Sequence, residues 1–502
     1  MKNKILQLLL IAFLINACIN HKLFAQTNEN SIKNIQATYP VIDELYSNYA
    51  RQNHFPSIVY GVIIDGQLVH TGNIGYTNLS EKIAADSTSD FRIASMTKSF
   101  TAMAILKLRD EGKLKLDDPV YLYIPEMKGQ QYLTTDAAAI TIRHLLTHSA
   151  GFPEDNPWGD RQLAITDKDF IQFIKKGISF SNNPGQQFEY SNLGFAMLGI
   201  IIKKVSGLSY QAYITKNIFK PLGMTHTYWE YSKVPASKLA LGYRWLNEQW
   251  LAQPLLHDGV YGAMGGMITS IEDFSKYVAF QLSAWPPRNN EDKGPIKRSS
   301  IREMQFPWNL AYFASSELCP LVYSYAYGLV WMKDCKGKVF VWHSGGLPGF
   351  GSSWTIMPDY NIGIISFSNL TYASNTDINK QVLDTLVAIA KLKPRQARVS
   401  AILNQRKSEL VQLLPEWKNP EATQIFAENF FMDHFPDSLR KEATTIFKNA
   451  GKIVRVQEMV AENNLRGSFI MEGENSDIVI SFTLTPQNPP LIQEYYIKER
   501  EK

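Results

Sequence analysis

The chain has 502 residues, of which 45% are hydrophobic and 20% are charged, and its formal net charge at pH 7 is +4. This length and composition are those of a globular protein with room for two or three domains. Because the net charge is small and no basic stripe is interleaved with aromatic residues, nucleic-acid binding is not expected.

The first 27 residues are predicted to be a targeting segment outside the fold. Two lysines precede an apolar run over residues 5–15, which is short for a membrane span and fits the hydrophobic region of a signal peptide. Residues 15–18 resemble a bacterial lipobox, which would attach a lipid to Cys18, whereas residues 23–25 resemble an ordinary cleavage site. The protein is therefore expected to be exported from a bacterial cell, either to the periplasm or as an outer-membrane lipoprotein.

A predicted β-hairpin and a predicted buried helix follow the targeting segment. Two β-rich runs, residues 57–64 and 67–70, flank an Asp-Gly pair, which is a strong hairpin signal. Further on, apolar residues recur at helical spacing from Ser95, or just before it, until Gly112. Mostly helical patterns then continue over residues 118–230.

Strand patterns return after residue 320, and a predicted helix follows them. The expected strands are residues 325–332, 338–342, 353–357 and 362–367, and the expected helix is 376–390. Strands from both ends of the region thus enclose a helical middle. This order predicts an α/β (α+β) fold in which an antiparallel sheet is flanked by helices, with an inserted helical domain as the second wall of a cleft.

A domain boundary is predicted near residues 391–395, which separates a domain at 28–392 from one at 393–502. The second domain has expected helices near 400–414, 420–431 and 438–450, followed by β runs at 453–460, 465–471, 477–484 and 491–497. Helices followed by a meander predict a small α+β domain. No catalytic pattern is present in it, and its role stays open.

The cysteines and histidines give little support for a metal site. With Cys18 in the targeting segment, Cys319 and Cys335 remain as a candidate disulfide, the alternative being two free thiols. His144 and His148 are four residues apart, but no glutamate follows His144 and no third ligand suggests itself. A structural role is expected for both histidines, and no metal or cofactor is expected.

Ser95 and Lys98 form a Ser-x-x-Lys quartet at the start of the predicted buried helix. Three residues apart, their side chains lie on one helical face. A serine becomes a good nucleophile when a neighbouring base takes its proton, and Lys98 can be that base if burial lowers its pKa. Alone, however, the quartet is better explained as an N-capping serine followed by a surface lysine.

Two further motifs could supply the rest of an active site. Tyr190–Asn192 precedes an apolar helix, and cations near Tyr190 would lower its pKa and make it a general base. Asn192 could hold a substrate amide or orient the lysine. His343–Gly346 ends a predicted strand, where small residues would let a substrate lie along the strand edge. Each motif alone is equally consistent with an ordinary loop or turn.

Together, the motifs Ser95–Lys98, Tyr190–Asn192 and His343–Gly345 resemble the three signature motifs of the serine β-lactamase and penicillin-binding-protein superfamily. The most similar branch is the class C β-lactamase-related group, which includes D-alanyl-D-alanine carboxypeptidases, esterases and D-amino-acid peptidases. The resemblance covers roughly residues 40–390, and the joint match is far more specific than any single motif.

The resemblance implies that Ser95 attacks a carbonyl and forms an acyl-enzyme. Lys98 and Tyr190 would share the proton transfers, and Tyr190 would activate the deacylating water. The backbone N–H groups of Ser95 and Gly346 would form the oxyanion hole. The residues that would bind the substrate are Asn192, His343 and Gly345.

His343 departs from the superfamily pattern, since most β-lactamases and carboxypeptidases have lysine there. A histidine with an unperturbed pKa of about 6.5 is mostly neutral at pH 7, so its grip on a substrate carboxylate is weaker. This departure favours cleavage of a small ester, amide or D-amino-acid peptide over β-lactam hydrolysis, and the bacterial cell wall is one candidate source of such a peptide. A true β-lactamase and a penicillin-binding sensor that does not turn over stay open as alternatives.

Overall fold

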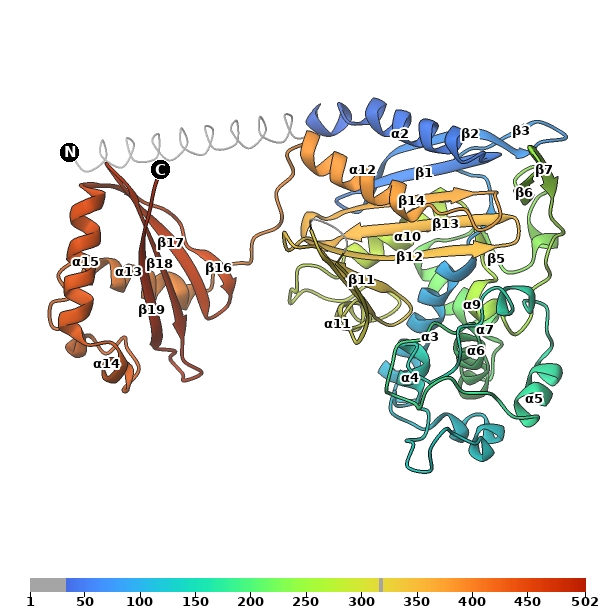
Figure 1. The fold of residues 1–502 in the computed structure, drawn as a ribbon, viewed down its shortest axis with the longest axis horizontal. Coiled ribbons are helices and arrows are strands. Elements are labelled where there is room, and N and C mark those ends of the chain that lie inside the picture. The colour runs from blue at the N-terminus through green and yellow to red at the C-terminus, as the bar shows by residue number, and fades with distance from the viewer. Residues whose placement is uncertain (1–32, 316–318) are drawn as a thin grey trace, which may run out of the picture. The chain divides into compact units, whose positions relative to one another are not determined.

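We describe the protein from a computed structural model, which covers residues 33–315 and 319–502 (Figure 1). The predicted targeting segment and Cys18 lie outside the described residues. The described residues fold as two compact units, which are divided between Lys393 and Pro394. The three sequence motifs all belong to the first unit.

A nine-stranded antiparallel sheet organises the first unit (Figure 1). Its strand order is β3-β2-β1-β14-β13-β12-β11-β10-β9, so the first strand pairs with the last. The strands are β1 (Ser57–Ile64), β2 (Gln67–Asn78), β3 (Ile83–Ala84), β9 (Asn309–Ala314), β10 (Leu321–Tyr325), β11 (Val330–Lys333), β12 (Val339–Leu347), β13 (Phe350–Met357) and β14 (Ile362–Ser368). The prediction of one antiparallel sheet built from both ends of the region is confirmed.

Helices cover both faces of this sheet, and the alternation of side chains along β1 shows how. Tyr60 and Val62 pack in one cluster with α2 (Tyr39–Gln52) and α12 (Thr376–Ile389). Val59 and Ile63 pack on the opposite face, in the cluster that contains buried residues of α10 (Ile271–Leu282). Since alternate strand residues point to opposite faces, a strand buried on both sides is apolar throughout, as β1 is.

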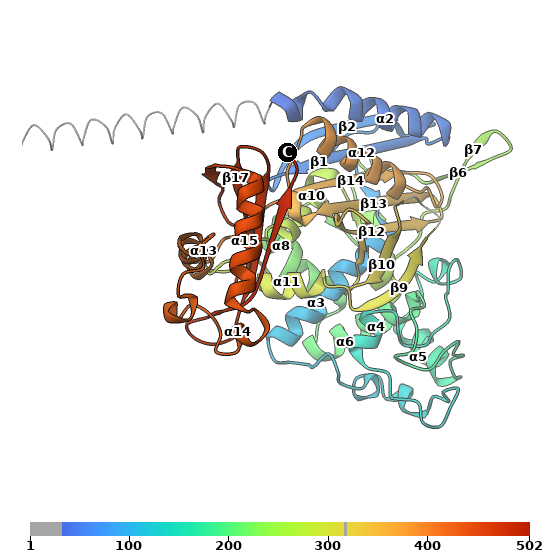
Figure 2. The same cartoon turned by 60° about the vertical axis from the view of Figure 1, so that its left-hand side comes forward.

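The remaining helices of the first unit lie on the α10 side of the sheet (Figure 2). They include α3 (Lys98–Asp110), α4 (Ile142–Leu146), α5 (Asp167–Lys175), α6 (Asn192–Ser206), α7 (Tyr210–Ile214), α8 (Lys220–Leu222), α9 (Gly262–Gly265), α10 (Ile271–Leu282) and α11 (Arg298–Met304). All of these helices come from the chain between β4 (Phe91–Arg92) and β9, which agrees with the predicted helical insertion.

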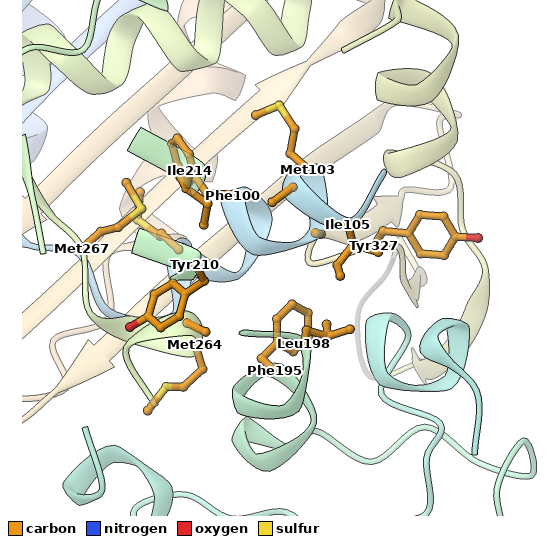
Figure 3. Packing of buried hydrophobic residues seen from close by; sticks show 14 of the residues in the cluster. Phe100, Met103, Ile105, Phe195, Leu198, Tyr210, Ile214, Met264, Met267 and Tyr327 are labelled. Atoms are coloured by element: carbon orange, nitrogen blue, oxygen red, sulfur yellow. The ribbon is translucent and has the colours of Figure 1, made fainter. Parts of the chain in front are cut away.

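Helix α3 runs through the centre of this core and carries the Ser-x-x-Lys motif at its start. Figure 3 shows its Phe100 and Met103 among side chains from α6, α7 and α9. Phe100 stacks on Tyr277, with 4.0 Å between ring centroids. A helix that is buried on nearly every side is held rigidly by its neighbours, which suits a platform for catalytic groups.

Three predicted elements are wrong in detail. The β run expected over residues 453–460 is divided into two strands, β15 (Ile453–Val456) and β16 (Val460–Asn463). The expected strand over residues 325–332 is broken by a turn between β10 and β11, where Gly328 has a φ of +66°. A Cβ at Gly328 would lie 2.8 Å from the Lys98 carbonyl oxygen, so the turn packs directly on the start of α3. The expected helix over 420–431 is split, because Asn419 and Gln424 both adopt left-handed conformations.

The second unit is a small α+β fold with its own core around the fully buried Trp417. Its strand order is β15-β17-β18-β19, and β16 pairs with β17. Its elements are α13 (Ala401–Leu413), α14 (Phe430–Asp433), α15 (Pro436–Ala450), β15 (Ile453–Val456), β16 (Val460–Asn463), β17 (Arg466–Gly473), β18 (Asp477–Leu484) and β19 (Ile492–Arg500).

No single helix among the described residues is long and apolar enough to cross a membrane. The segments Asn192–Ser206 and Tyr210–Leu222 meet the length and composition test only together, and they are bent by 72° at the break between them. Both belong largely to the buried core of the first unit.

Candidate active site

Ser95 lies in a one-turn 3-10 helix, Ala94–Thr97, that continues directly into α3. The preceding Ala94 has a φ of +49°, a conformation that residues other than glycine rarely adopt. Ser352 Oγ donates to the Ile93 carbonyl oxygen at 2.7 Å, and Thr97 Oγ1 donates to the Ala94 carbonyl oxygen at 2.7 Å. These bonds hold the bend that places Ser95 on the wall of a cavity.

Lys98 is fully buried, and its Nζ contacts three oxygen atoms. They are Ser95 Oγ at 2.9 Å, Asn192 Oδ1 at 2.7 Å and the Met264 carbonyl oxygen at 3.1 Å. The amide and carbonyl oxygens can only accept hydrogen bonds. A neutral lysine amine has two N–H bonds and one lone pair, so with both N–H groups donated to these oxygens its lone pair points at the Ser95 hydroxyl.

The surroundings of Lys98 allow its neutral amine to be populated near pH 7. Burial lowers the pKa of Lys98 from 10.5 to about 7, against the opposing effect of the Asp160 and Asp155 carboxylates. A general base works best when its pKa is near the working pH. The geometry and the pKa together make Lys98 a candidate base for Ser95.

Tyr190 lies beside this pair but differs from the expectation drawn from the sequence. Its hydroxyl is hydrogen-bonded to Ser95, and Lys98 Nζ lies 4.9 Å from the centre of its ring. Burial raises the pKa of Tyr190 instead of lowering it, and the Asp160 and Asp155 carboxylates raise it further, against the opposing effect of the hydrogen bond with Ser95. Tyr190 therefore stays a neutral phenol. It can relay a proton, but it is not deprotonated in the resting protein.

Asn192 is fully buried below the cavity, where it holds Lys98. It is the first residue of α6, and its Nδ2 donates to Asn156 Oδ1 at 2.7 Å. Asp155 accepts from the backbone N–H groups of Asn192 and Leu193 at 2.7 and 2.8 Å, which caps α6. Of the two roles considered for Asn192, the structure favours orienting the lysine over contacting the substrate.

His343 lines the cavity as a neutral ring. Its Nδ1 donates to the Ser344 carbonyl oxygen at 2.6 Å, so its Nε2 is the acceptor for the Tyr325 hydroxyl at 3.0 Å. Burial, together with the charge of Lys98, lowers the pKa of His343 to about 3. Because both nitrogens are bonded within the protein and the ring is uncharged, His343 offers no cation to a substrate carboxylate.

Gly345 and Gly346 allow β12 to pass close to the nucleophile. A Cβ on Gly345 would lie 2.2 Å from the Ile93 carbonyl oxygen, and one on Gly346 would lie 2.9 Å from Tyr372 Cδ1. Gly345 itself is buried against the Ser95 turn, whereas Gly346 lines the cavity. The glycines are thus required by packing, and they bring the end of β12 beside Ser95.

Replacing Gly345 with alanine is expected to lower the free energy of unfolding by about 2 kcal/mol, because the new methyl group meets backbone and must displace it. Since the displaced segment carries Ser95, turnover should also fall by about 100-fold. Thermal unfolding and steady-state kinetics measure the two effects. Gly129→Ala is the matched control, because a Cβ there meets nothing within 4 Å. Equal behaviour of the two variants would contradict this packing role.

The cavity beside Ser95 has a volume of about 550 Å³, which is the size of a small-molecule site. Its walls are mostly aromatic or apolar, and they include two residues that the sequence interpretation missed, Asp160 and Tyr372. The acidic stretch over residues 154–160 is the signal that could have pointed to Asp160. The lining residues are Ser95, Asn156, Pro157, Asp160, Phe188, Tyr190, Tyr325, Val330, Trp342, His343, Ser344, Gly346 and Tyr372.

The cysteines and histidines hold structure around the site. Cys319 and Cys335 form a disulfide at the open end of the β10–β11 hairpin. His144 caps α4 through the Thr141 backbone N–H, and His148 Nδ1 accepts from the Ser191 backbone N–H at 3.1 Å. Among the described residues, no group of three or more His, Cys, Asp or Glu side chains is placed to hold a metal ion.

The sequence is similar to those of two known proteins over most of its length. Protein flp of Staphylococcus aureus (strain N315) is 30% identical to the chain over 377 residues, which cover 73% of this chain and 70% of the relative. Beta-lactamase-like protein 2 of Dictyostelium discoideum is 27% identical over 405 residues, which cover 77% of this chain and 70% of the relative.

Two solved structures share the fold. The octameric penicillin-binding protein homologue from Pyrococcus abyssi aligns with a TM-score of 0.57 and 23% identity, over 92% of this chain and 96% of the other. A class C beta-lactamase aligns with a TM-score of 0.55 and 21% identity, over 70% of this chain and 96% of the other. The sequence model of the Beta-lactamase family matches residues 42–387. The chain therefore belongs to the Beta-lactamase family, within the superfamily of serine β-lactamases and penicillin-binding proteins.

Proposed function

We propose that the protein is an exported serine hydrolase that cleaves a small ester, amide or D-amino-acid peptide through an acyl-enzyme on Ser95. The observation that carries the proposal is the contact between Ser95 Oγ and the buried Nζ of Lys98 at 2.9 Å, on the wall of a cavity of substrate size. A serine activated by a neighbouring base is the arrangement that covalent acyl transfer needs.

In the proposed reaction, Ser95 Oγ attacks the substrate carbonyl carbon while its proton passes to the lone pair of Lys98. The negative charge that develops on the carbonyl oxygen is stabilised by the backbone N–H groups of Ser95 and Gly346. Collapse of this intermediate breaks the bond to the leaving group, which receives the proton through Lys98 or the neutral phenol of Tyr190. Water then attacks the acyl-enzyme, and its proton returns by the same groups.

The substrate preference follows from the cavity. A neutral His343 with both nitrogens engaged gives no ionic grip on the carboxylate that β-lactams carry. This supports an ester, amide or peptide as substrate. Export is supported by residues 1–27 of the sequence, and the Cys319–Cys335 disulfide is consistent with it, since such bonds persist in oxidising compartments.

A substrate panel tests the proposal. The purified protein should hydrolyse at least one of p-nitrophenyl esters, D-amino-acid amides and D-Ala-D-Ala peptides, with nitrocefin a poor substrate. Fast nitrocefin hydrolysis would show a β-lactamase instead. A burst of one equivalent of product without steady turnover would show a penicillin-binding sensor.

The rate of acylation is expected to rise with pH through an apparent pKa near 7. Only the neutral amine of Lys98 can take the Ser95 proton, and burial lowers the pKa of Lys98 to about 7, so the active fraction grows as pH increases through that value. The measurement is kcat/KM for a non-ionising ester between pH 5 and 9. A flat profile over this range would contradict the role of Lys98 as base.

A further inference from the structure

One wall of the active-site cavity carries a carboxylate that the proposed chemistry does not use. Asp160 is only 2% exposed, yet it lines the cavity together with Ser95. It lies in a single 3-10 turn, Gly159–Arg161, of the helical side of the cleft. A buried carboxylate costs free energy unless it is paired and hydrogen-bonded, so its place in a substrate cavity needs a reason.

The partners of Asp160 within the protein leave its charge largely unmatched. Tyr372 donates one hydrogen bond to Asp160 Oδ2 at 3.1 Å, whereas a carboxylate can accept about four. In the described parts of the chain no Lys or Arg forms an ion pair with Asp160, and Lys98 and Arg161 act on its pKa only at longer range. Burial accordingly raises the pKa of the Asp160 carboxyl.

Tyr372 fixes where this carboxylate sits relative to the reacting centre. It has a φ of +53°, and its backbone N–H is held by the carbonyl oxygens of Leu347 and Phe350. Its ring packs against Gly346, and its hydroxyl reaches across to Asp160. The bond therefore links the sheet side of the cavity to the helical side, beside the backbone that would hold the oxyanion.

The charge that lines the cavity is consequently of one sign, negative. Asp160 is the acidic group of the lining, the His343 ring is neutral, and the remaining walls are mainly aromatic, with Phe188, Tyr325 and Trp342 among them. An anion would be repelled by this site, whereas an ammonium group would satisfy the carboxylate and could also lie against aromatic faces.

We propose that Asp160 binds the protonated amino group of the substrate, so that the enzyme prefers amides or esters of amino acids whose α-amino group is free. This inference rests on the proposed acyl-enzyme function and narrows its substrate class. Tyr372 positions the carboxylate, and Asp160 discriminates between an ammonium group and its acylated, uncharged counterpart.

Protection of Ser95 against a fluorophosphonate probe tests the inference without requiring turnover. Alanine p-nitroanilide, as either enantiomer, should slow labelling about 100-fold more effectively than N-acetylalanine p-nitroanilide, and Asp160→Asn should abolish that difference. If the protein hydrolyses these anilides, the Asp160→Asn substitution should lower kcat/KM about 100-fold for the free amine. For the acetylated compound, the same substitution should lower kcat/KM less than about threefold. Asp136→Asn is the matched control, since it removes one exposed carboxylate outside the cavity.

The outcomes separate this inference from the proposed function. Equal protection by the two compounds in the unmodified protein, or equal losses for both in Asp160→Asn, would overturn ammonium recognition while leaving the serine hydrolase intact. Absence of any probe adduct on Ser95 would instead overturn the proposed function, and with it this inference. Tyr372→Phe should reduce the preference for the free amine in the same direction, by a smaller factor.

Discussion

Replacing Ser95 with alanine is expected to reduce turnover at least about 10⁴-fold, because it removes the hydroxyl that would attack the substrate carbonyl. Ser95 lies on the cavity wall with Lys98 Nζ at 2.9 Å, and the bend at Ala94 fixes its direction. The alanine side chain removes a single oxygen atom, so the fold should persist. Steady-state kinetics with the best substrate of the panel and thermal unfolding are the measurements.

Ser99→Ala is the matched control for this variant. Ser99 lies four residues further along, and its Oγ bonds back to the Met96 carbonyl oxygen at 3.0 Å, away from the cavity lining. It should keep turnover close to that of the unmodified protein. If Ser95→Ala turned over substrate as fast as Ser99→Ala, the proposed acyl-enzyme on Ser95 would be wrong.

Replacing Lys98 with methionine is expected to lower kcat about 10³-fold, since the proton acceptor for Ser95 is lost. Methionine fills much of the same buried volume, so stability should change little: the burial cost of the amine disappears, while Asn192 Oδ1 and the Met264 carbonyl oxygen lose a donor. The rise of activity through pH 7 should disappear as well. Kinetics from pH 5 to 9 and thermal unfolding check these effects.

Lys107→Met, on the same helix, controls for loss of a lysine without loss of the base. Lys107 pairs with Glu111 and the Pro295 carbonyl oxygen, outside the cavity. Its kcat and pH profile should match those of the unmodified protein. A Lys98→Met protein with kcat within tenfold of normal and an unchanged pH profile would assign the base to another group.

The sequence was most informative where chemistry depends on local spacing. The Ser95–Lys98 pair needs only the start of one helix, so its relative geometry follows from helical periodicity. The antiparallel sheet was also predictable, because the strand patterns lie at both ends of the first unit. The ends of individual strands were less predictable than the sheet itself. For example, the turn at Gly328 packs on the Lys98 carbonyl oxygen, and no local sequence pattern reveals that contact.

Properties that depend on tertiary burial could not be predicted from the sequence. A cation near Tyr190 suggested a lowered pKa, but the structure surrounds the phenol so fully that desolvation decides the direction. Likewise, the sequence left Asn192 with two possible roles, holding a substrate amide or orienting Lys98, and only the packing of α6 against α3 brings its side chain to Lys98. Asp160 and Tyr372 are 212 residues apart, so their contact across the cavity carries no sequence signature.

Mass spectrometry of the protein after reaction with a fluorophosphonate tests the central claim most directly. The account predicts one adduct per chain, mapped to Ser95, and no adduct in Ser95→Ala. A folded protein that hydrolyses its substrate but carries no adduct, or carries it on a residue other than Ser95, would contradict the account.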